Sequence, residues 1–313
     1  TPRPSLLGLV CLLLLLVPGA AKGQLFENLK SLSQRLPVGD PSIPDPVRGP
    51  KGIAAADFNG DGLGDFAVSD KNGSITLYLS RGEAGFAPPI YLQAGAGELR
   101  GIVAGDFNGD GRPDIATAAP FEGVVHLFLN DGNGSFHDRP FSSWLGGRDL
   151  ATGDFDGDGR LDLVVAGPKM GLVQYQGLGD GTFAVVRSFL ELDSVACGDS
   201  SDFPQPAYFL QSFRLPGRRM DSLVAAHGEG CDHLWVFTPG ADGVLAITGE
   251  LKNIDVNALA VGNVLHPIGQ GPPELVTASL NRGYFEARRF DPALGSFEPT
   301  ASVQIPVEGG PRS

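Results

Sequence analysis

Short apolar runs separated by clusters of glycine, asparagine and aspartate recur along most of this chain. Three such runs, GIAAA (52–56), GIVAG (101–105) and LATG (150–153), each lead into an aspartate-rich loop. A second apolar run follows each loop, and a third and a less regular fourth come after it. Runs of this length bounded by turn residues predict short β-strands. Helical periodicity is clear at most in residues 25–36.

The pattern repeats with a period of nearly 50 residues. The first aspartates of the three loops, Asp57, Asp106 and Asp154, are 49 and 48 residues apart. Two degenerate copies follow, at 213–226 and 260–278. The five repeats therefore run approximately over residues 50–100, 101–148, 149–208, 209–258 and 259–313.

Four strands in each repeat predict an all-β fold, a β-propeller of four-stranded blades with five recognisable repeats. A single four-stranded sheet cannot bury both of its faces. Blades stacked around an axis cover one another's faces, which explains why the unit is repeated.

The N-terminus has a different character. Arg3 precedes the apolar run LLGLVCLLLLLV, and the small-residue stretch PGAAKG follows it. This order predicts a secretory signal peptide over residues 1–23, followed by an N-terminal segment at 24–49. The run is too short for a comfortable membrane span, so we expect no stable membrane insertion. The predicted location is secreted or extracellular, with the periplasm and the cell surface as alternatives.

The charge of the chain excludes one class of partner. The net charge is −13, and it becomes −15 without Arg3 and Lys22, the only charged residues in 1–23. Such an acidic protein is a poor candidate for binding nucleic acid. Ten of the 36 carboxylates lie in the three loops, where bound cations would neutralise much of the charge.

The three loops read DFNGDGLGD (57–65), DFNGDGRPD (106–114) and DFDGDGRLD (154–162). Oxygen-bearing side chains stand at positions 1, 3, 5 and 9, and glycines at positions 4 and 6. Calcium takes six to eight oxygen ligands, and alternate side chains of a tight loop can converge on one ion. We also expect the backbone carbonyl at position 7 to be a ligand. The predicted ligands are Asp57, Asn59, Asp61, Leu63 and Asp65; Asp106, Asn108, Asp110, Arg112 and Asp114; and Asp154, Asp156, Asp158, Arg160 and Asp162.

Two alternatives compete with calcium at these loops. Asn-Gly and Asp-Gly also form ordinary hairpin turns, but three loops in register that each keep four oxygen side chains exceed what a turn needs. Magnesium prefers a smaller octahedral shell that retains several waters. About three structural calcium ions are therefore the expected cofactors.

These motifs carry a resemblance to a family. DFNGDGLGDFAV, DFNGDGRPDIAT and DFDGDGRLDLVV, with LNDGNGSF and LGDGTF downstream, resemble FG-GAP/VCBS repeats. That family includes the integrin α propeller and many bacterial exported proteins. The resemblance implies a calcium site in each intact loop and a bacterial exported type. The fourth and fifth repeats, around Asp221 and from Asn263 to Glu274, depart from the pattern, and we expect no metal there.

The position within the repeat at which the sequence ends bears on the expected number of blades. The last residues, QIPVEGGPRS, resemble DPVRGPKG, which leads into the first loop. This predicts a fragment of a seven-bladed propeller. The alternative is a five-bladed propeller in which residues 36–50 supply the closing strand.

After signal cleavage, two cysteines remain, Cys197 and Cys231. A disulfide between them is the default expectation for an exported protein. Free thiols, or a metal site joining Cys197 to HGEGCDH (227–233), are the alternatives.

The motifs favour a secreted binding or adhesion module for an unidentified protein or glycan. The alternatives are a carbohydrate-active enzyme resembling a polysaccharide lyase, or a spacer in a larger surface protein. An enzyme would need a base near the axis, and the candidates are His126, His227, His233, His266 and Glu229. The sequence contains no nucleophile elbow, HExxH or phosphate loop, so we predict no catalytic residue.

Overall fold

The computed structural model describes residues 49–306 with several breaks. The breaks are 96, 144–146, 168–170, 190–207, 228–232, 253, 255, 257, 263–270, 280–283 and 302. The predicted signal peptide, residues 24–48, Cys197 and Cys231 therefore lie outside the described residues. Within the described residues, no helix has the length and apolar character that a membrane crossing requires.

The described residues form five antiparallel sheets in chain order, which we call blades 1 to 5. Blade 1 contains β1 (Pro50–Ala56), β2 (Asp65–Asp70), β3 (Ser74–Tyr78), the short 3-10 helix η1 (Gly82–Ala84) and β4 (Ile90–Gln93). Blade 2 contains β5 (Ile102–Gly105), β6 (Asp114–Ala119), β7 (Val124–Gly132), β8 (Ser135–Asp138) and β9 (Phe141–Ser142). Blade 3 contains β10 (Asp149–Gly153), β11 (Asp162–Ala166), β12 (Leu172–Gly177) and β13 (Phe183–Phe189). Blade 4 contains β14 (Tyr208–Arg214), β15 (Asp221–His227), β16 (His233–Pro239) and β17 (Leu245–Lys252). Blade 5 contains β18 (Ala258–Gly262), β19 (Glu274–Ser279), β20 (Tyr284–Asp291), β21 (Ser296–Phe297) and β22 (Val303–Pro306).

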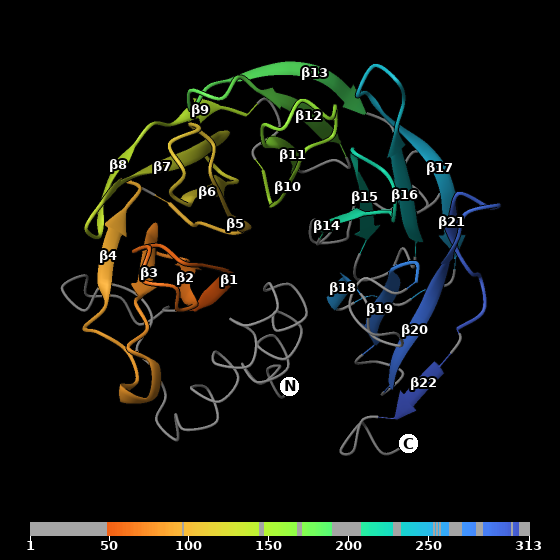
Figure 1. Cartoon of the computed structure of the whole chain (residues 1–313), viewed down its shortest axis with the longest axis horizontal. Helices are drawn as coiled ribbons and strands as arrows, with labels where there is room; N and C mark the ends of the chain where they lie inside the picture. The colour runs from red at the N-terminus through yellow and green to blue at the C-terminus, as the bar shows by residue number, and fades with distance from the viewer. Residues whose placement is uncertain are drawn as a thin grey trace.

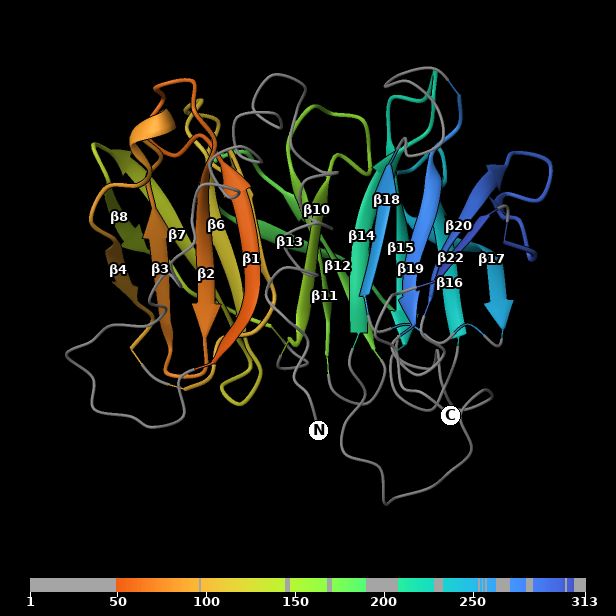
Figure 2. The same ribbon diagram turned by 90° about the horizontal axis from the view of Figure 1, so that it is seen from below.

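The blades are arranged around a common centre (Figure 1). The first strand of each blade is innermost, and β1 packs near β5, β5 near β10, β10 near β14 and β14 near β18. Figure 2 shows the strands side-on, with β1 running upwards and β2 returning downwards. The all-β propeller prediction is confirmed, whereas the seven-blade count stays a prediction.

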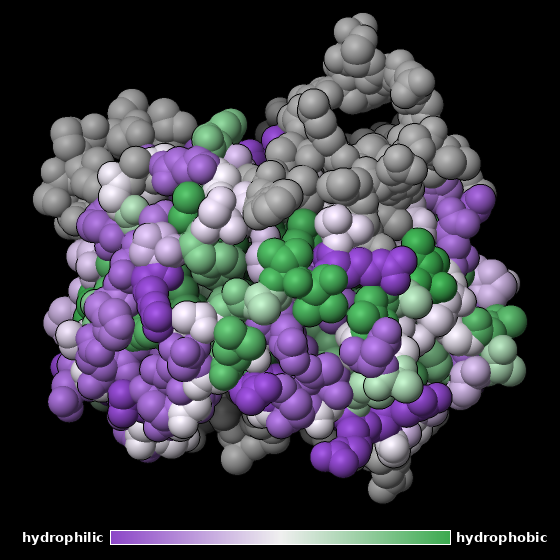
Figure 3. All heavy atoms as spheres, turned by 90° about the horizontal axis from the view of Figure 1, so that it is seen from above, coloured by the Kyte–Doolittle hydropathy of each residue, from purple (hydrophilic) through white to green (hydrophobic). Residues whose placement is uncertain are grey.

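Burial changes from the centre of the molecule to its rim. All residues of β2 and β6 are buried, because these second strands lie between neighbouring blades. A strand covered on both faces needs small and apolar residues throughout, which explains the runs FAVSD and IATAA. The outer strands are more exposed, and β13 exposes the neighbouring residues Val185 and Val186. Figure 3 views the outer side of the molecule, where apolar groups gather near the middle among polar ones.

The hydrophobic core is divided into four clusters between adjacent blades. One cluster joins blades 1 and 2 and includes Leu77 and Ile102, and another joins blades 2 and 3 and includes Leu127 and Leu163. The other two clusters join blade 3 to blade 4 and blade 4 to blade 5. Each blade is therefore stabilised by its neighbours, as expected for a repeat that cannot fold alone.

Candidate metal loops and central pocket

The three aspartate loops join the first strand of blades 1, 2 and 3 to the second strand. Each loop is closed at its base by a strand pair, Ala56 with Asp65, Gly105 with Asp114 and Gly153 with Asp162. In the first loop Gly60 and Gly62 have positive φ of 74° and 84°. These values are in the left-handed region that favours glycine, so the turn itself requires the glycines at positions 4 and 6.

The aspartate at position 1 organises each loop through backbone hydrogen bonds. The Asp57 carboxylate accepts the N–H of Gly60 at 2.7 Å and that of Gly62 at 2.8 Å. Asp106 accepts the corresponding bonds at 2.7 and 2.8 Å, and Asp154 at 2.7 and 3.2 Å. The same bonds recur in all three loops, so the three sequences fold locally in the same way.

The aspartate at position 9 is buried and joins the loop to the third strand. Asp65 accepts the N–H of Phe58 at 2.9 Å and the N–H of Ser80 at 2.7 Å. Asp114 and Asp162 accept the equivalent pairs of bonds at 2.8 to 2.9 Å. This backbone-binding role was not predicted from the sequence. Its signal is an acid that begins the second strand in every repeat, including those that lost the other ligands.

Burial also perturbs these three carboxyl groups. It raises the pKa of Asp65, Asp114 and Asp162 to about 6, because a charged carboxylate loses its hydration. The two backbone hydrogen bonds oppose the shift, and the neighbouring loop aspartates add to it by like-charge repulsion. A bound cation would remove both unfavourable contributions.

The third loop gathers three of its predicted ligands. Carboxylate oxygens of Asp154, Asp156 and Asp162, at positions 1, 3 and 9, all lie within 4.8 Å of one another. Asp158 at position 5 is absent from this group, and its Oδ2 pairs with the guanidinium of Arg160 at 2.5 Å. The three clustered oxygens are hard donors of the kind that calcium prefers, so this donor set fits the ion.

The first two loops have asparagine at position 3 where the third has aspartate, but the hydrogen bonds of this position are the same in all three. Asn59 and Asn108 there accept the N–H of the position-5 residue at 3.0 Å through their side-chain oxygens, as Asp156 does in the third loop. The position-5 aspartates, Asp61 and Asp110, in turn accept the N–H of Leu63 and Arg112 at 2.8 and 2.9 Å. Asp158 accepts the N–H of Arg160 in the same way at 2.8 Å. That the carbonyls of these position-7 residues bind metal stays a prediction.

The loops also connect each blade to the next one. The phenylalanine at position 2, Phe58, Phe107 or Phe155, is at most 2% exposed and belongs to the core between adjacent blades. The carbonyl of Phe58 accepts a hydrogen bond from Asn130 in blade 2, and that of Phe107 from Gly181 in blade 3. Whatever fixes the loop therefore also fixes the junction between two blades.

Blade 4 has a shorter connection at the equivalent place. Arg214 pairs with Asp221 across the base of the loop, and the two side chains form an ion pair with contacts of 2.6 and 2.9 Å. Asp221 also accepts the N–H of Asp154 at 2.9 Å, so it joins blade 4 to the third loop. In blade 5 the buried Glu274 begins the second strand opposite Gly262.

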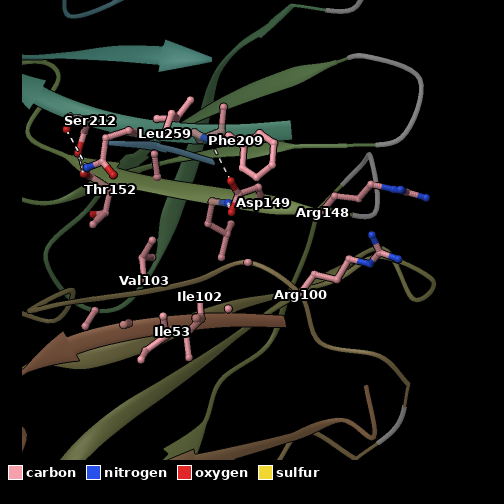
Figure 4. A pocket seen from close by; sticks show the side chains of 18 of the residues that line it. Ile53, Arg100, Ile102, Val103, Arg148, Asp149, Thr152, Phe209, Ser212 and Leu259 are labelled. Carbon is pink, nitrogen blue, oxygen red and sulfur yellow. Dashed lines mark hydrogen bonds between the residues drawn. The ribbon is translucent and has the colours of Figure 1, made fainter. Parts of the chain in front are cut away.

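A central pocket of about 680 Å³ lies among the first strands of all five blades. Figure 4 shows Asp149, Thr152, Phe209 and Ser212 at its wall. The Asp149 carboxylate accepts the N–H of Leu210 at 2.8 Å, and Ser212 donates its hydroxyl to the carbonyl of Thr152 at 2.5 Å. Burial raises the pKa of Asp149 to about 7. The pocket therefore has a wall of fixed polar groups joining blades 3 and 4.

Among the described candidates for a catalytic base, His126 and His233 lie on strands away from this pocket. His126 lies on β7, is buried, and places its Nδ1 2.7 Å from Asp138. His233 lies on β16 with its Nε2 3.9 Å from Glu250. Neither lines the central pocket. His227 ends β15, while Glu229 and His266 lie outside the described residues.

The fold and the loops define a β-propeller whose first three blades carry aspartate-rich turns. The family model described as FG-GAP-like repeat matches residues 57–117 and 106–165. Residues 57–165 therefore contain FG-GAP-like repeats, as the motifs predicted. No curated protein sequence matches the chain.

Solved structures share the fold at low sequence identity. A putative 6-phosphogluconolactonase from Bacteroides uniformis has a TM-score of 0.56 and 15% identity, over 78% of this chain and 68% of that one. BBS1N, solved in complex with ARL6DN, has a TM-score of 0.53 and 13% identity, over 80% and 69% of the two chains. Saccharomyces cerevisiae Sqt1 has a TM-score of 0.51 and 9% identity, over 83% and 63%. These similarities show the propeller-like fold.

Proposed function

We propose that this protein is a secreted binding module, a propeller stabilised by one calcium ion in each of its first three loops. The observation that carries the proposal is the clustering of Asp154, Asp156 and Asp162 in a loop whose backbone hydrogen bonds recur in blades 1 and 2. FG-GAP repeats are typical of extracellular proteins, which agrees with the predicted signal peptide over residues 1–23.

The proposed calcium ions are structural. Extracellular calcium modules bind with Kd of roughly 10⁻⁴ to 10⁻³ M. At about 1 mM calcium each site would stabilise the fold by roughly 0.4 to 1.4 kcal/mol. Because each loop holds a phenylalanine in the core between two blades, calcium would strengthen the junctions on which the central pocket depends.

The ligand, in this proposal, is a protein or a glycan, and the central pocket is the place for a small ligand or a ligand end. Pockets of roughly 300 to 1,000 Å³ are typical of small-molecule sites. The propeller fold alone does not fix a function, so the proposal depends on this pocket and on the loops.

A thermal melt of the purified chain tests the structural part of the proposal. We expect a cooperative transition in 2 mM calcium and a melting temperature lower by several degrees in excess EDTA. The same melting temperature in both buffers would contradict a stabilising role for calcium.

A further inference from the structure

Each of the three aspartate loops places a phenylalanine ring against the next blade. Phe58, Phe107 and Phe155, at position 2, are at most 2% exposed and belong to the cores between blades. The ring centroid of Phe58 lies 6.3 Å from that of Phe136 in blade 2. Phe107 meets Phe183 of blade 3 in the same way, at 5.9 Å. Each receiving ring stands two residues after a glycine of positive φ, in the hairpin between the third and fourth strands.

Blade 4 lacks the ring of the loop, whereas blade 5 keeps the receiving ring. The loop between β14 and β15 reads LPGRRM (215–220), with Pro216 at position 2. In blade 5, Phe297 again stands two residues after a hairpin glycine of positive φ. The junction of blades 4 and 5 therefore has one half of an aromatic contact that the earlier junctions complete with a loop residue.

A strand residue of blade 4 supplies part of the missing contact. The ring of Phe213, on β14, lies 5.6 Å from that of Phe297 and 5.9 Å from that of Phe290. The rings of Phe290 and Phe297 are 5.3 Å apart. Because Phe213 comes from the strand, a pocket remains between the blade 4 loop and the blade 5 hairpin.

This space, which we call the junction pocket, has a volume of about 470 Å³. Its walls include Leu215, Pro216 and Met220 of the blade 4 loop and Pro292 of the blade 5 hairpin. Pro216 and Pro292 are exposed, whereas Phe290, which also lines the pocket, is 3% exposed. The junction pocket therefore opens to solvent between prolines and reaches a buried aromatic ring.

We propose that the junction pocket binds a phenylalanine side chain of a partner protein, where blades 1 to 3 use a phenylalanine of their own loop. The three earlier junctions show that a phenylalanine ring packs well at this place in the repeat. A ring entering the pocket would meet Phe290 and Met220. Aromatic pairs and contacts between methionine sulfur and a ring are both favourable.

We expect the residue beside that phenylalanine to be acidic. Arg218 lines the junction pocket and is exposed, so a carboxylate of the ligand can reach its guanidinium. Hydrogen bonds between a guanidinium and a carboxylate are stronger than those between neutral groups. The proposed partner segment is therefore a phenylalanine next to an acidic residue.

The lining favours a protein side chain over a saccharide. Among the described lining residues, Ser222 and Thr238 supply the side-chain hydroxyls, whereas apolar groups come from both blades. Aromatic anchors in well-packed, desolvated pockets dominate the binding energy of protein interfaces. The inference rests on the proposed binding function, whose partner it names, and uses neither the calcium ions nor the central pocket.

The test is a ligand-observed NMR titration of the full chain in 2 mM calcium. The probes are the capped peptides Gly-Asp-Phe-Gly, Gly-Asp-Ala-Gly and Gly-Asn-Phe-Gly, with phenylacetate as a small aromatic acid. We expect Gly-Asp-Phe-Gly to bind at least tenfold more tightly than the alanine peptide, because the ring supplies most of the contact. It should bind about threefold more tightly than the asparagine peptide, which lacks the charge.

Variants locate the binding. Pro216→Phe offers a ring from within the chain, so it should raise the melting temperature and weaken Gly-Asp-Phe-Gly binding about tenfold or more. Pro292→Asp should weaken binding to a similar extent, because its carboxylate repels that of the probe. Arg218→Gln should weaken binding about threefold. The matched controls are Pro88→Phe and Pro88→Asp, at an exposed proline of blade 1, and Arg219→Gln, at an exposed neighbour that does not line the pocket.

Each contrary outcome has a distinct meaning. Equal binding of the phenylalanine and alanine peptides, or parent-like binding by both folded variants Pro216→Phe and Pro292→Asp, would overturn the ring site. Tighter binding of phenylalanine-free partners is excluded by the same comparison, and tighter binding of phenylacetate would overturn the assignment to a protein. If no probe bound, the junction site would be rejected, while calcium-dependent melting would still test the proposed scaffold separately.

A second copy of the chain is the remaining occupant to test. Phe121, 75% exposed and followed by Glu122, has the chemistry that the pocket requires. Sedimentation of the parent at increasing concentration should show no association. Self-association that Phe121→Ala abolishes would overturn the assignment to a different protein.

Discussion

Blades 3 and 4 solve the same structural problem with different chemistry. In both, a loop must turn sharply from the first strand to the second and remain fixed against the neighbouring blade. Blade 3 uses a nine-residue loop in which carboxylate oxygens of Asp154, Asp156 and Asp162 lie within 4.8 Å of one another. Blade 4 uses a shorter loop closed by the Arg214–Asp221 ion pair. In blade 4 the guanidinium of Arg214 thus has the role that we propose for a calcium ion in blade 3.

The comparison separates two roles that the loop motif combines. An acid begins the second strand in all five blades, as Asp65, Asp114, Asp162, Asp221 and Glu274. In the first three blades it accepts two backbone N–H groups, a role that needs no metal. The long loops of blades 1 to 3 all have aspartate at position 1. At position 3 they have asparagine in blades 1 and 2 and aspartate in blade 3. These are the residues that we propose bind metal, and the simple turn of blade 4 lacks them.

The largest expected effect is a pH dependence that appears when calcium is removed. The folded pKa of about 6 for Asp65, Asp114 and Asp162 lies above the unfolded value near 3.8. The folded state therefore binds protons more tightly, and stability is lost as pH rises from about 4 to 6. Each loop contributes on the order of 3 kcal/mol. Urea unfolding in calcium-free buffer should show the loss, and 2 mM calcium should greatly reduce it. Equal slopes with and without calcium would contradict the account.

Next in size is the effect of deleting a position-9 carboxylate. Asp162→Ala leaves the buried N–H groups of Phe155 and Gly177 without their acceptor. Each unsatisfied group costs about 1 to 3 kcal/mol, so the free energy of unfolding should fall by roughly 2 to 6 kcal/mol. Chemical denaturation in calcium and in EDTA should both show the loss. The exposed Asp131→Ala, which lies outside the three loops, is the control, with a small effect expected. A loss confined to calcium buffer would mean that Asp162 acts through metal alone.

Breaking the ion pair of blade 4 should have a smaller effect that is independent of calcium. Arg214→Met leaves Asp221, whose side chain is 14% exposed, without its cation. We expect the free energy of unfolding to fall by about 1 to 3 kcal/mol, equally in calcium and in EDTA. A loss that vanished in EDTA would show that blade 4 also depends on calcium.

The smallest effects are expected from single metal ligands. Asp57→Asn, Asp106→Asn and Asp154→Asn each preserve an acceptor for the loop backbone while removing a charge from the site. Each should lower stability by roughly 0.4 to 1.4 kcal/mol at about 1 mM calcium and by less in EDTA. Melting curves at several calcium concentrations measure the difference. Effects of the same size in EDTA would assign these residues to turn formation.

The blades and the loops could be predicted from the sequence because both depend on patterns among residues that are close together in the chain. The glycines of positive φ and the spacing of the aspartates can be read within a loop of nine residues. The order of the strands can be read within one repeat of about fifty residues. The contact of Asp221 with the N–H of Asp154 spans 67 residues and depends on how two blades meet. The junction pocket was missed for the same reason. The absence of a phenylalanine from the blade 4 loop was visible, but the pocket itself depends on how blades 4 and 5 meet.

The most direct test of the account is to count the calcium ions bound by the parent chain and by Asp57→Asn, Asp106→Asn and Asp154→Asn. Equilibrium dialysis at calcium concentrations well above the Kd gives the number bound per chain. The account predicts three ions for the parent and two for each variant, with no additional ion in blade 4. A parent chain that binds none, or variants that all still bind three, would contradict the claim that these loops are calcium sites.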